Sequence, residues 1–490
     1  MTEDRAVGAP ERLHPLFLLT GLGGSLRGVL GGWAAVGYLG VSGRLSFALL
    51  LAAAMLVLLA ASVFLYWRRF EYRVGEDEIR IDSGIFSRTH RSIPFDRVQD
   101  VDITQGPVAR LFGLAQVKFE TGSASAQNPD EGVLQAITLA RAEQLRLQVR
   151  AHRSGVTAAV PATDAPDAPP LFAMDGKRVL LAGVFNFSLA LFAGLFGASQ
   201  SFGNIIGFDP LSRSFWLQLV NAGDPIAQYV LAHRIAAVTA GLALLVLAGL
   251  ATGLVRTVLR EYGFRVDRAA AGLRRRRGLV TRTDVTLPVA RIQAAIVATG
   301  PVRDTFGWRE LKLQSLAQDE GGKGDHVLAP LARDPEVATL LAELGWSLPT
   351  DAGWRPVSRA FVWTLALGLA PLALIALGQM LFFPALGLAA LAVLGAILAI
   401  RWLAWRRTAF AFHGDLLLVR SGWWRRRLLV LPRRRIQSID LSENFIGRRF
   451  GIAALAFGVA GGSGYSAHAI PALPRETARD LRQRLLGSAA

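Results

Sequence analysis

Long apolar stretches limit how this chain can fold. A helix that crosses a bilayer needs about 20 mostly apolar residues, and six stretches of the sequence approach this length. They run over residues 25–41, 46–67, 179–198, 235–255, 361–382 and 386–405. The stretches come as three close pairs, and long polar segments separate the pairs. The sequence therefore predicts a polytopic α-helical membrane protein in which six transmembrane helices form three hairpins.

The first apolar stretch has a second interpretation. Arg27 interrupts it, and an arginine near the end of a helix can extend its guanidinium to the headgroups at modest cost. Residues 14–30 would then form an interfacial amphipathic helix that leads into a short span. The alternative matters because the loss of one span would change the side of the membrane on which the first polar segment lies.

The charge of the chain also points to a membrane. Of 490 residues, 52% are hydrophobic and 19% are charged, and 54 Lys and Arg outnumber 37 Asp and Glu for a formal charge of +17. Such a surplus suits nucleic acid or an anionic membrane face. The arginines lie beside the apolar stretches and are not gathered on one element, so we expect membrane lipids and no nucleic acid as partners. By the positive-inside rule, the N-terminus and the polar segments face the cytoplasm.

The three polar segments repeat one another. "PFDRVQD" begins at Pro94, "PVARIQA" at Pro288 and "PRRRIQS" at Pro432. The copies align without a gap from a glycine before each motif to a Phe-Gly pair after it. These shared positions are Gly84, Gly278 and Gly422, then Phe112-Gly113, Phe306-Gly307 and Phe450-Gly451. Self-similarity of this kind indicates a tandem array of one structural unit.

Each copy reads as strands followed by one helix. Ile79 and Ile81 alternate with polar residues, as in a half-buried strand. After Asp334 and Pro335, apolar residues follow helical spacing. The predicted boundaries are 1–67 for the N-terminal segment and first hairpin, 68–153 for domain 1, 154–177 for a Pro/Ala-rich linker, 178–256 for the second hairpin with an external loop at 199–234, 257–346 for domain 2, 347–358 for a linker, 359–405 for the third hairpin and 406–490 for domain 3.

The repeated unit resembles a known family. The stretch "YRVGEDEIRIDSGIFSRTHRSIPFDRVQDVDITQGPVARLFGLAQVKFETG" and its two echoes are similar to the bacterial pleckstrin-homology (PH) domain of membrane-flanked, YdbT-like and YdbS-like proteins. The second copy departs most, because its first hairpin is two residues longer. The resemblance implies three PH-like β-barrels, each closed by a C-terminal helix, in a multi-pass protein of the bacterial inner membrane. It also implies no assigned catalysis, a role in envelope stress or in resistance to membrane-active agents, and a smaller two-span relative as a partner.

The repeated motif offers candidate binding residues. Arginine and glutamine side chains could present donors to an acidic ligand. Alternatively, the proline ends a strand, and the arginine or glutamine satisfies backbone groups where the next strand begins. Both readings concern Arg97, Gln99, Arg291, Gln293, Arg435 and Gln437. The Phe-Gly pair is expected to be structural, as an aromatic core anchor followed by a residue that tolerates a tight turn.

Basic clusters flank the glycine-centred hairpin of every copy. An arginine near an anionic leaflet contributes about 1 kcal/mol of attraction, and tryptophans such as Trp423 and Trp424 favour the headgroup level. The candidate contacts to anionic headgroups are Arg88, Arg91, Arg274, Arg275, Arg276, Arg277, Arg425, Arg426 and Arg427. The alternative is a charged hairpin that is only solvated.

Signatures of enzymes and metal sites are missing from the sequence. The chain lacks cysteine, which excludes disulfides, thiolate nucleophiles and Cys-ligated metals. The histidines form no close ligand pair, and in "GGSGYS" Tyr465 replaces the second glycine of a nucleophile elbow. We therefore expect a non-enzymatic binding or scaffolding protein with no cofactor and no metal. A lipid or peptide transporter with the domains as cytoplasmic gates is the alternative, although the apolar stretches hold no Asp or Glu.

Overall fold

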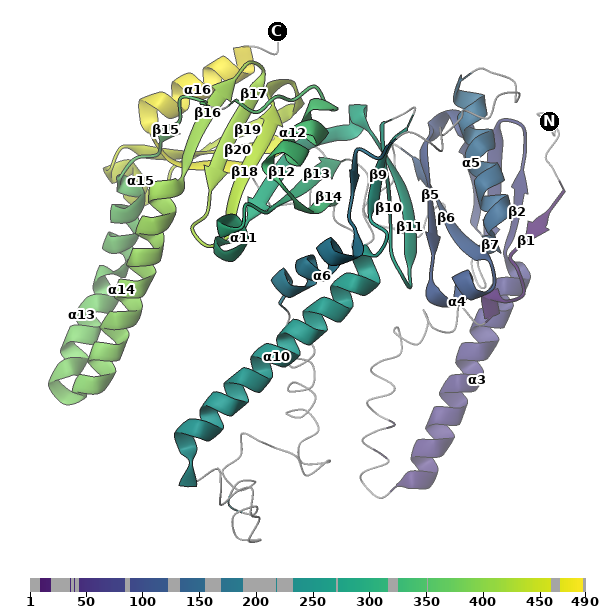
Figure 1. Ribbon diagram of the computed structural model, residues 1–490, viewed down its shortest axis with the longest axis horizontal. Helices are drawn as coiled ribbons and strands as arrows, with labels where there is room; N and C mark the ends of the chain where they lie inside the picture. Colours follow the sequence, from purple (N-terminus) through teal and green to yellow (C-terminus); the bar gives the residue numbers. More distant parts are fainter. Residues whose placement is uncertain are drawn as a thin grey trace. The chain divides into compact units, whose positions relative to one another are not determined.

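The computed structural model describes thirteen segments of the chain (Figure 1). They are residues 9–18, 36, 39, 44–83, 89–121, 133–154, 169–187, 217, 232–269, 272–315, 325–349, 351–459 and 468–487. The chain divides into two compact units. Unit 1 comprises residues 1–168, 173–265 and 275–286, and unit 2 comprises residues 169–172, 266–274 and 287–490.

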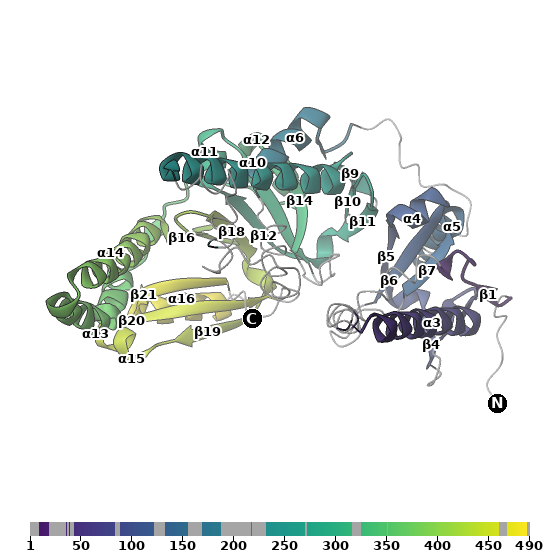
Figure 2. The same ribbon diagram turned by 90° about the horizontal axis from the view of Figure 1, so that it is seen from below.

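Four helices are long and apolar enough to cross a membrane: α3 (Leu45–Arg69), α10 (Arg234–Glu261, apolar from Thr239), α13 (Ala360–Phe382) and α14 (Pro384–Arg407). They confirm four of the six predicted spans. Many of their large apolar side chains are exposed, as expected for surfaces that contact lipid. Helices α13 and α14 lie side by side as a hairpin in both views (Figure 1 and Figure 2). They approach closely at Gly387, where a Cβ atom would meet the Ala376 carbonyl oxygen at 2.7 Å.

The other two predicted spans are not shown. Residues 25–41 lie outside the described part of the chain, apart from residues 36 and 39. The stretch 179–198 begins within α6 (Gly176–Phe185), but this helix ends after ten residues, and residues 188–198 are not described. Helix α6 packs closely on α10, because a Cβ atom on Gly183 would meet the Leu254 Cα atom at 2.9 Å. The side chain of Asn186, the C-cap residue, donates to the Thr257 hydroxyl at 3.1 Å.

The strands of residues 68–153, 257–346 and 406–490, here called modules 1, 2 and 3, fall into an N-terminal and a C-terminal half-sheet in each module. Module 1 has β2 (Glu71–Val74), β3 (Glu78–Ser83) and β4 (Thr89–Pro94), then β5 (Val98–Gln105), β6 (Leu114–Thr121) and β7 (Val133–Thr138). Module 2 has β9 (Arg265–Ala269), β10 (Gly272–Arg277) and β11 (Arg282–Pro288), then β12 (Ile292–Thr299), β13 (Arg309–Ser315) and β14 (Asp325–Ala332). Module 3 has β16 (Ala409–His413), β17 (Leu416–Ser421) and β18 (Arg426–Pro432), then β19 (Ile436–Ser442), β20 (Ile452–Val459) and β21 (His468–Pro474).

A two-residue strand precedes each predicted membrane hairpin and adds to the N-terminal half-sheet that follows it. These strands are β1 (Glu11–Arg12), β8 (Phe172–Ala173) and β15 (Arg355–Pro356). Two tryptophans at the ends of membrane helices reinforce the arrangement. Trp67 Nε1 donates to the Leu13 carbonyl oxygen at 2.9 Å, and Trp405 Nε1 donates to the Val357 carbonyl oxygen at 3.0 Å. The residues just before the first and third predicted hairpins are therefore held against the ends of α3 and α14.

Consecutive modules share sheets. The strand orders are β1-β2-β3-β4, β7-β6-β5-β11-β10-β9-β8, β14-β13-β12-β18-β17-β16-β15 and β19-β20-β21. The C-terminal half-sheet of module 1 thus continues through β5 and β11 into module 2, and that of module 2 continues through β12 and β18 into module 3. The described strands form four open sheets, whereas the resemblance implied three closed barrels. The outer edges of β5 and β12 are each paired with a strand of the next module, which provides partners for their backbone groups.

One helix closes each module, as predicted. These helices are α5 (Leu139–Ser154), α12 (Asp334–Ala342) and α16 (Arg475–Gly487). The apolar residues that the sequence placed at helical spacing are buried, among them Leu145, Leu340 and Leu481. Full burial of one such side chain contributes about 1.5–3 kcal/mol. The helix is therefore a principal part of each module's core.

The Phe-Gly pairs do not anchor the core, so this prediction was wrong. Phe112, Phe306 and Phe450 are 45%, 62% and 41% exposed. Each is the C-cap residue of a five-residue helix, namely α4 (Pro107–Leu111), α11 (Pro301–Thr305) or α15 (Phe445–Arg449). The glycines behave as predicted, because Gly113, Gly307 and Gly451 have φ values of 65°, 71° and 64°.

A matched pair of phenylalanines in module 3 tests this correction. Phe457 on β20 is 1% exposed and belongs to the core, so Phe457→Ala should lower the free energy of unfolding by about 3–5 kcal/mol. Phe450→Ala removes the same atoms from an exposed site and should cost less than about 0.5 kcal/mol. Thermal unfolding of the purified full chain in detergent measures both, and equal losses would show that Phe450 is a core residue after all.

Candidate membrane-proximal site

The glycine-centred hairpins of modules 2 and 3 lie at the ends of membrane helices. In module 2, the amide of Gly278 donates to the Tyr262 carbonyl oxygen at 2.8 Å, and the amide of Leu279 donates to the Leu259 carbonyl oxygen at 3.0 Å. Leu259 lies in the last turn of α10, and Tyr262 follows that helix. In module 3, Arg407 at the end of α14 donates from Nη1 to the Trp423 carbonyl oxygen at 3.3 Å. Both hairpins are therefore held where the chain leaves the membrane.

Glycine is required at the tip of these hairpins. Gly278 and Gly422 have φ values of 112° and 87°, which side chains other than hydrogen rarely allow. A Cβ atom would also meet the Thr281 carbonyl oxygen at 1.8 Å or the Arg425 carbonyl oxygen at 2.1 Å. Backbone geometry thus explains the shared glycine in modules 2 and 3.

The arginine run of module 2 divides between two faces of a strand. β10 lies between β9 and β11, and successive side chains of a strand point to opposite faces. Arg275 and Arg277 are 0% and 2% exposed, whereas Arg274 and Arg276 are half-buried. Burial removes Arg275 and Arg277 from any lipid surface, so the predicted headgroup contact does not hold for these two in this structure. For Arg274 and Arg276 it stays a prediction.

A buried ion pair occupies part of this cluster. Arg277 Nη1 lies 3.1 Å from Glu261 Oε1, and Glu261 is the last residue of α10. Both side chains are buried. Removal of one partner from a buried pair leaves an uncompensated charge, which is strongly destabilising. The pair therefore ties the second strand of module 2 to the membrane helix that precedes it.

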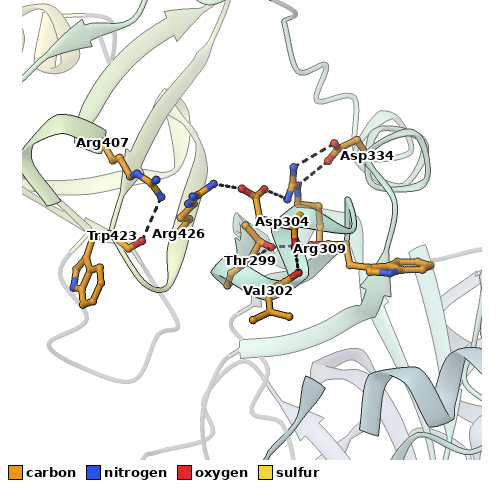
Figure 3. Close-up of polar contacts among 11 residues, drawn as sticks. Thr299, Val302, Asp304, Arg309, Asp334, Arg407, Trp423 and Arg426 are labelled. Atoms are coloured by element: carbon orange, nitrogen blue, oxygen red, sulfur yellow. Dashed lines mark hydrogen bonds and ion pairs between the residues drawn. The ribbon is translucent and has the colours of Figure 1, made fainter. Parts of the chain in front are cut away.

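The hairpin of module 3 uses one arginine to hold the junction with module 2. Arg426 forms an ion pair with Asp304 on α11, and Asp304 also accepts a hydrogen bond from Arg309 (Figure 3). Arg309 Nε lies 3.0 Å from Asp334 Oδ1. Beside this network, Arg425 Nη2 lies 3.8 Å from Glu310 Oε2. Arginines of module 3 therefore pair with acidic side chains of module 2 close to the β12–β18 strand pair.

The remaining surface of this hairpin is basic and aromatic. Arg425, Arg427 and Trp424 are exposed, and the rings of Trp423 and Trp424 are 5.5 Å apart. Trp423 and Val302 point the same way in Figure 3, away from the ion pairs. Such a surface combines the two side-chain types that favour an anionic membrane interface. The headgroup contacts of Arg425 and Arg427 stay predictions.

The repeated motif lies at the bend between the two half-sheets of each module. Its Pro ends a strand, and the next three residues form a 3₁₀ turn, at η1 (Phe95–Arg97), η2 (Val289–Arg291) and η3 (Arg433–Arg435). In module 2, Arg291 and Gln293 are buried, and Gln293 Nε2 donates to the Arg291 carbonyl oxygen at 3.0 Å. This geometry favours the structural reading for that copy.

The other copies of the motif leave the choice open. Arg435 is half-buried and Gln437 is exposed in module 3. The side chains of Arg97 and Gln99 lie outside the described part of module 1, and so does Arg88. Arg91 is half-buried on β4, opposite Ile81 of β3. A ligand role for these residues stays a prediction.

Sequence reasoning missed a polar contact between modules 2 and 3. His468 Nε2 lies 2.6 Å from the amide oxygen of Gln314 on β13. Burial lowers the pKa of His468 below its ordinary value of 6.5, with Asp325 raising it and Arg427 lowering it further. Because the two residues are 154 positions apart, no local pattern marks the contact. The two residues lie in different sheets, Gln314 in the sheet that modules 2 and 3 share and His468 in the sheet β19-β20-β21.

Comparison with known proteins agrees with the repeated architecture. A family model for the bacterial PH domain matches residues 21–153, 215–345 and 365–489. The chain belongs to the bacterial PH domain family. Each matched range includes membrane-helix sequence as well as a module, so bacterial PH modules and their preceding spans repeat together along the chain.

Two curated relatives come from Bacillus subtilis (strain 168). The chain is similar to UPF0699 transmembrane protein YdbT, with 25% identity over 296 residues, which is 58% of this chain and 57% of YdbT. It is also similar to UPF0699 transmembrane protein YdbS, with 40% identity over 80 residues, which is 16% of this chain and 45% of YdbS. The chain thus spans about half the length of the curated relatives it matches. No solved structure matches.

The Asp304–Arg426 pair should couple modules 2 and 3 energetically. Both side chains keep partial access to solvent, so a double-mutant cycle with Asp304→Asn and Arg426→Gln should give a coupling of about 1 kcal/mol that shrinks with added salt. Thermal unfolding of the four variants measures the coupling. The exposed Asp480–Arg484 pair on α16 is the control and should couple by less than about 0.5 kcal/mol. Equal coupling in the two cycles would show that the junction pair has no special role.

His468 should make unit 2 less stable in mild acid. Its pKa is lower in the folded chain than the ordinary value of 6.5, so the unfolded chain takes up the proton first as the pH falls. Stability that is present above about pH 6.5 is therefore lost toward the lowered folded pKa. His468→Gln should flatten this part of the pH profile of thermal unfolding. His413→Gln, at an exposed strand end, is the matched control, and the same flattening in both would contradict the assignment.

Proposed function

We propose that the chain is a membrane scaffold that acts by binding and not by catalysis. In this proposal, three PH-like modules form a continuous platform at the cytoplasmic face of the bacterial inner membrane, anchored by six spans in three hairpins. The platform binds anionic headgroups and partner proteins, and so organises a complex that protects the envelope against membrane-active agents. A smaller relative with one PH-like module and two spans, of the YdbS kind, is the partner we favour.

The sharing of sheets between modules carries this proposal. Independent domains on flexible linkers would each keep their own strand edges, whereas β5 pairs with β11 and β12 pairs with β18. Such pairing fixes the register of neighbouring modules. A row of modules in fixed register suits a scaffold, because it presents equivalent surfaces at set intervals.

The position of the basic hairpins supports a contact with lipid. The Gly278 and Gly422 hairpins form hydrogen bonds with residues at or just beyond the ends of α10 and α14. Arginines held there lie within reach of the leaflet, where anionic lipid attracts them. The arginines and lysine next to the predicted spans favour the cytoplasmic leaflet.

The experiment is affinity purification of the full chain from native membranes, with lipids and proteins identified together. Replacement of Trp424, Arg425 and Arg427 by Ala should deplete the co-purified anionic lipid several-fold, because it removes the exposed basic and aromatic surface of the hairpin. The control replaces Arg479 and Arg482, two exposed arginines of α16, and should leave the lipids unchanged.

Partners and phenotype provide the second part of this test. A strain without the gene should be more sensitive to membrane-active peptides, and the unaltered chain should restore resistance. Recovery of no specific protein, together with unchanged survival across a panel of such agents, would contradict the scaffold role. Movement of labelled lipid or peptide by the purified chain in liposomes would favour a transporter instead.

A further inference from the structure

Two strands, β19 in module 3 and β4 in module 1, each lie at the edge of their sheet. The strands at the equivalent positions of the neighbouring modules have a partner on that edge. Among the described strands, β19 is the first strand of the sheet β19-β20-β21, and β4 is the last of β1-β2-β3-β4. The repeat makes β19 equivalent to β5 and β12, and it makes β4 equivalent to β11 and β18. At both junctions within the chain, a strand of the first kind pairs with a strand of the second kind.

The register of the two junctions is identical. Arg282 lies opposite Gln105 at the first junction, and Arg426 lies opposite Thr299 at the second. Arg282 and Arg426 are equivalent positions of the repeat, and so are Gln105 and Thr299. Two independent occurrences of one register show that this edge pairing is a property of the module.

The difference in burial shows what the missing neighbour changes. On β12, which has neighbours on both edges, Ala294 and Ala298 are buried. The equivalent residues of β19, Ser438 and Ser442, are exposed. An edge strand presents unpaired backbone groups that can template another strand.

We propose that the β19 edge binds the β4 edge of a second copy of this chain, antiparallel and in the register of the two internal junctions. The contact joins unlike surfaces, the end of one array to the start of the next, and therefore produces rings or open chains of copies. This inference uses the shared sheets and the membrane anchoring, and it does not depend on the ligands or partners of the scaffold.

Charge complementarity supports this occupant. The shared register places Asp440 opposite Arg91 of the second copy, whereas the equivalent residues at the internal junction, Ile296 and Leu429, are apolar partners. Opposite charges directly across a strand pair are favourable, and like charges are unfavourable. Both side chains have access to solvent. Such access is needed, because the two edges must be exposed before the copies assemble.

The membrane also favours this pairing. α3 leads directly into module 1, and α14 leads directly into module 3. Copies inserted in the same bilayer share one orientation and meet in two dimensions, which raises their effective concentration. In this arrangement, module 3 of one copy contacts module 1 of a neighbouring copy in the same membrane.

Disulfide trapping tests the register, because the chain has no cysteine of its own. Two full-length chains with different tags are co-expressed, one with Ser442→Cys and the other with Thr89→Cys, which the register places face to face. Oxidation in native membranes should join the two tags. In the control, the second chain carries Ser92→Cys in place of Thr89→Cys. Residue 92 lies about 10 Å further along the strand, out of disulfide reach of residue 442. The yield of the control should be about tenfold lower.

A charge reversal provides the second readout. Asp440→Arg should lower the Ser442–Thr89 yield several-fold, and Arg91→Asp in the other chain should restore it. Equal trapping in both registers would indicate random collisions and overturn the proposal. A disulfide formed within a single chain that carries both cysteines, or no joined tags at all, would overturn it as well. The lipid and partner measurements above use other residues, so the two proposals can fail separately.

Discussion

Backbone pairing between successive modules is the interaction on which the rest of this structure depends. β12 lies between β13 of its own module and β18 of the next, and its residues 295–298 pair with strands on both edges. The ion pairs of Asp304 with Arg309 and Arg426, and the contact between His468 and Gln314, lie beside this shared sheet. Without the strand pair, Arg426 would lose Asp304 as its partner, and His468 would lose Gln314.

The membrane helices are joined to the sheets where they end. The two-residue strands before the hairpins pair with the first strands after them, and Trp67 and Trp405 close the same point with indole hydrogen bonds. In module 2, Glu261 occupies the equivalent place and pairs with Arg277. Where α10 and α14 end, the glycine-centred hairpins of modules 2 and 3 are hydrogen-bonded to the same points.

Much of this fold could be predicted from local sequence, and its failures have physical causes. Alternation at Ile79 and Ile81 and helical spacing at Leu340 and Leu341 marked real elements, because both patterns report which face is buried. The prediction that Phe450 anchors the core failed, because repetition of an aromatic residue does not show whether other side chains cover it. The prediction for Arg275 failed in the opposite way, because a run of four arginines does not show which face of β10 the rest of the fold covers. The contact of Asp304 with Arg426 could not be predicted, because it depends on a register between modules that no local pattern encodes.

The central claim is that modules 2 and 3 share one sheet. Ala298 on β12 lies directly opposite Arg427 on β18, and opposite Cα atoms of an antiparallel pair lie about 4.5–5.5 Å apart. The most direct measurement is disulfide formation in a single chain that carries Ala298→Cys and Arg427→Cys, followed by peptide mapping by mass spectrometry. The account predicts a nearly complete internal disulfide under mild oxidation in native membranes. Persistent free thiols at both positions would show that the modules are separate domains.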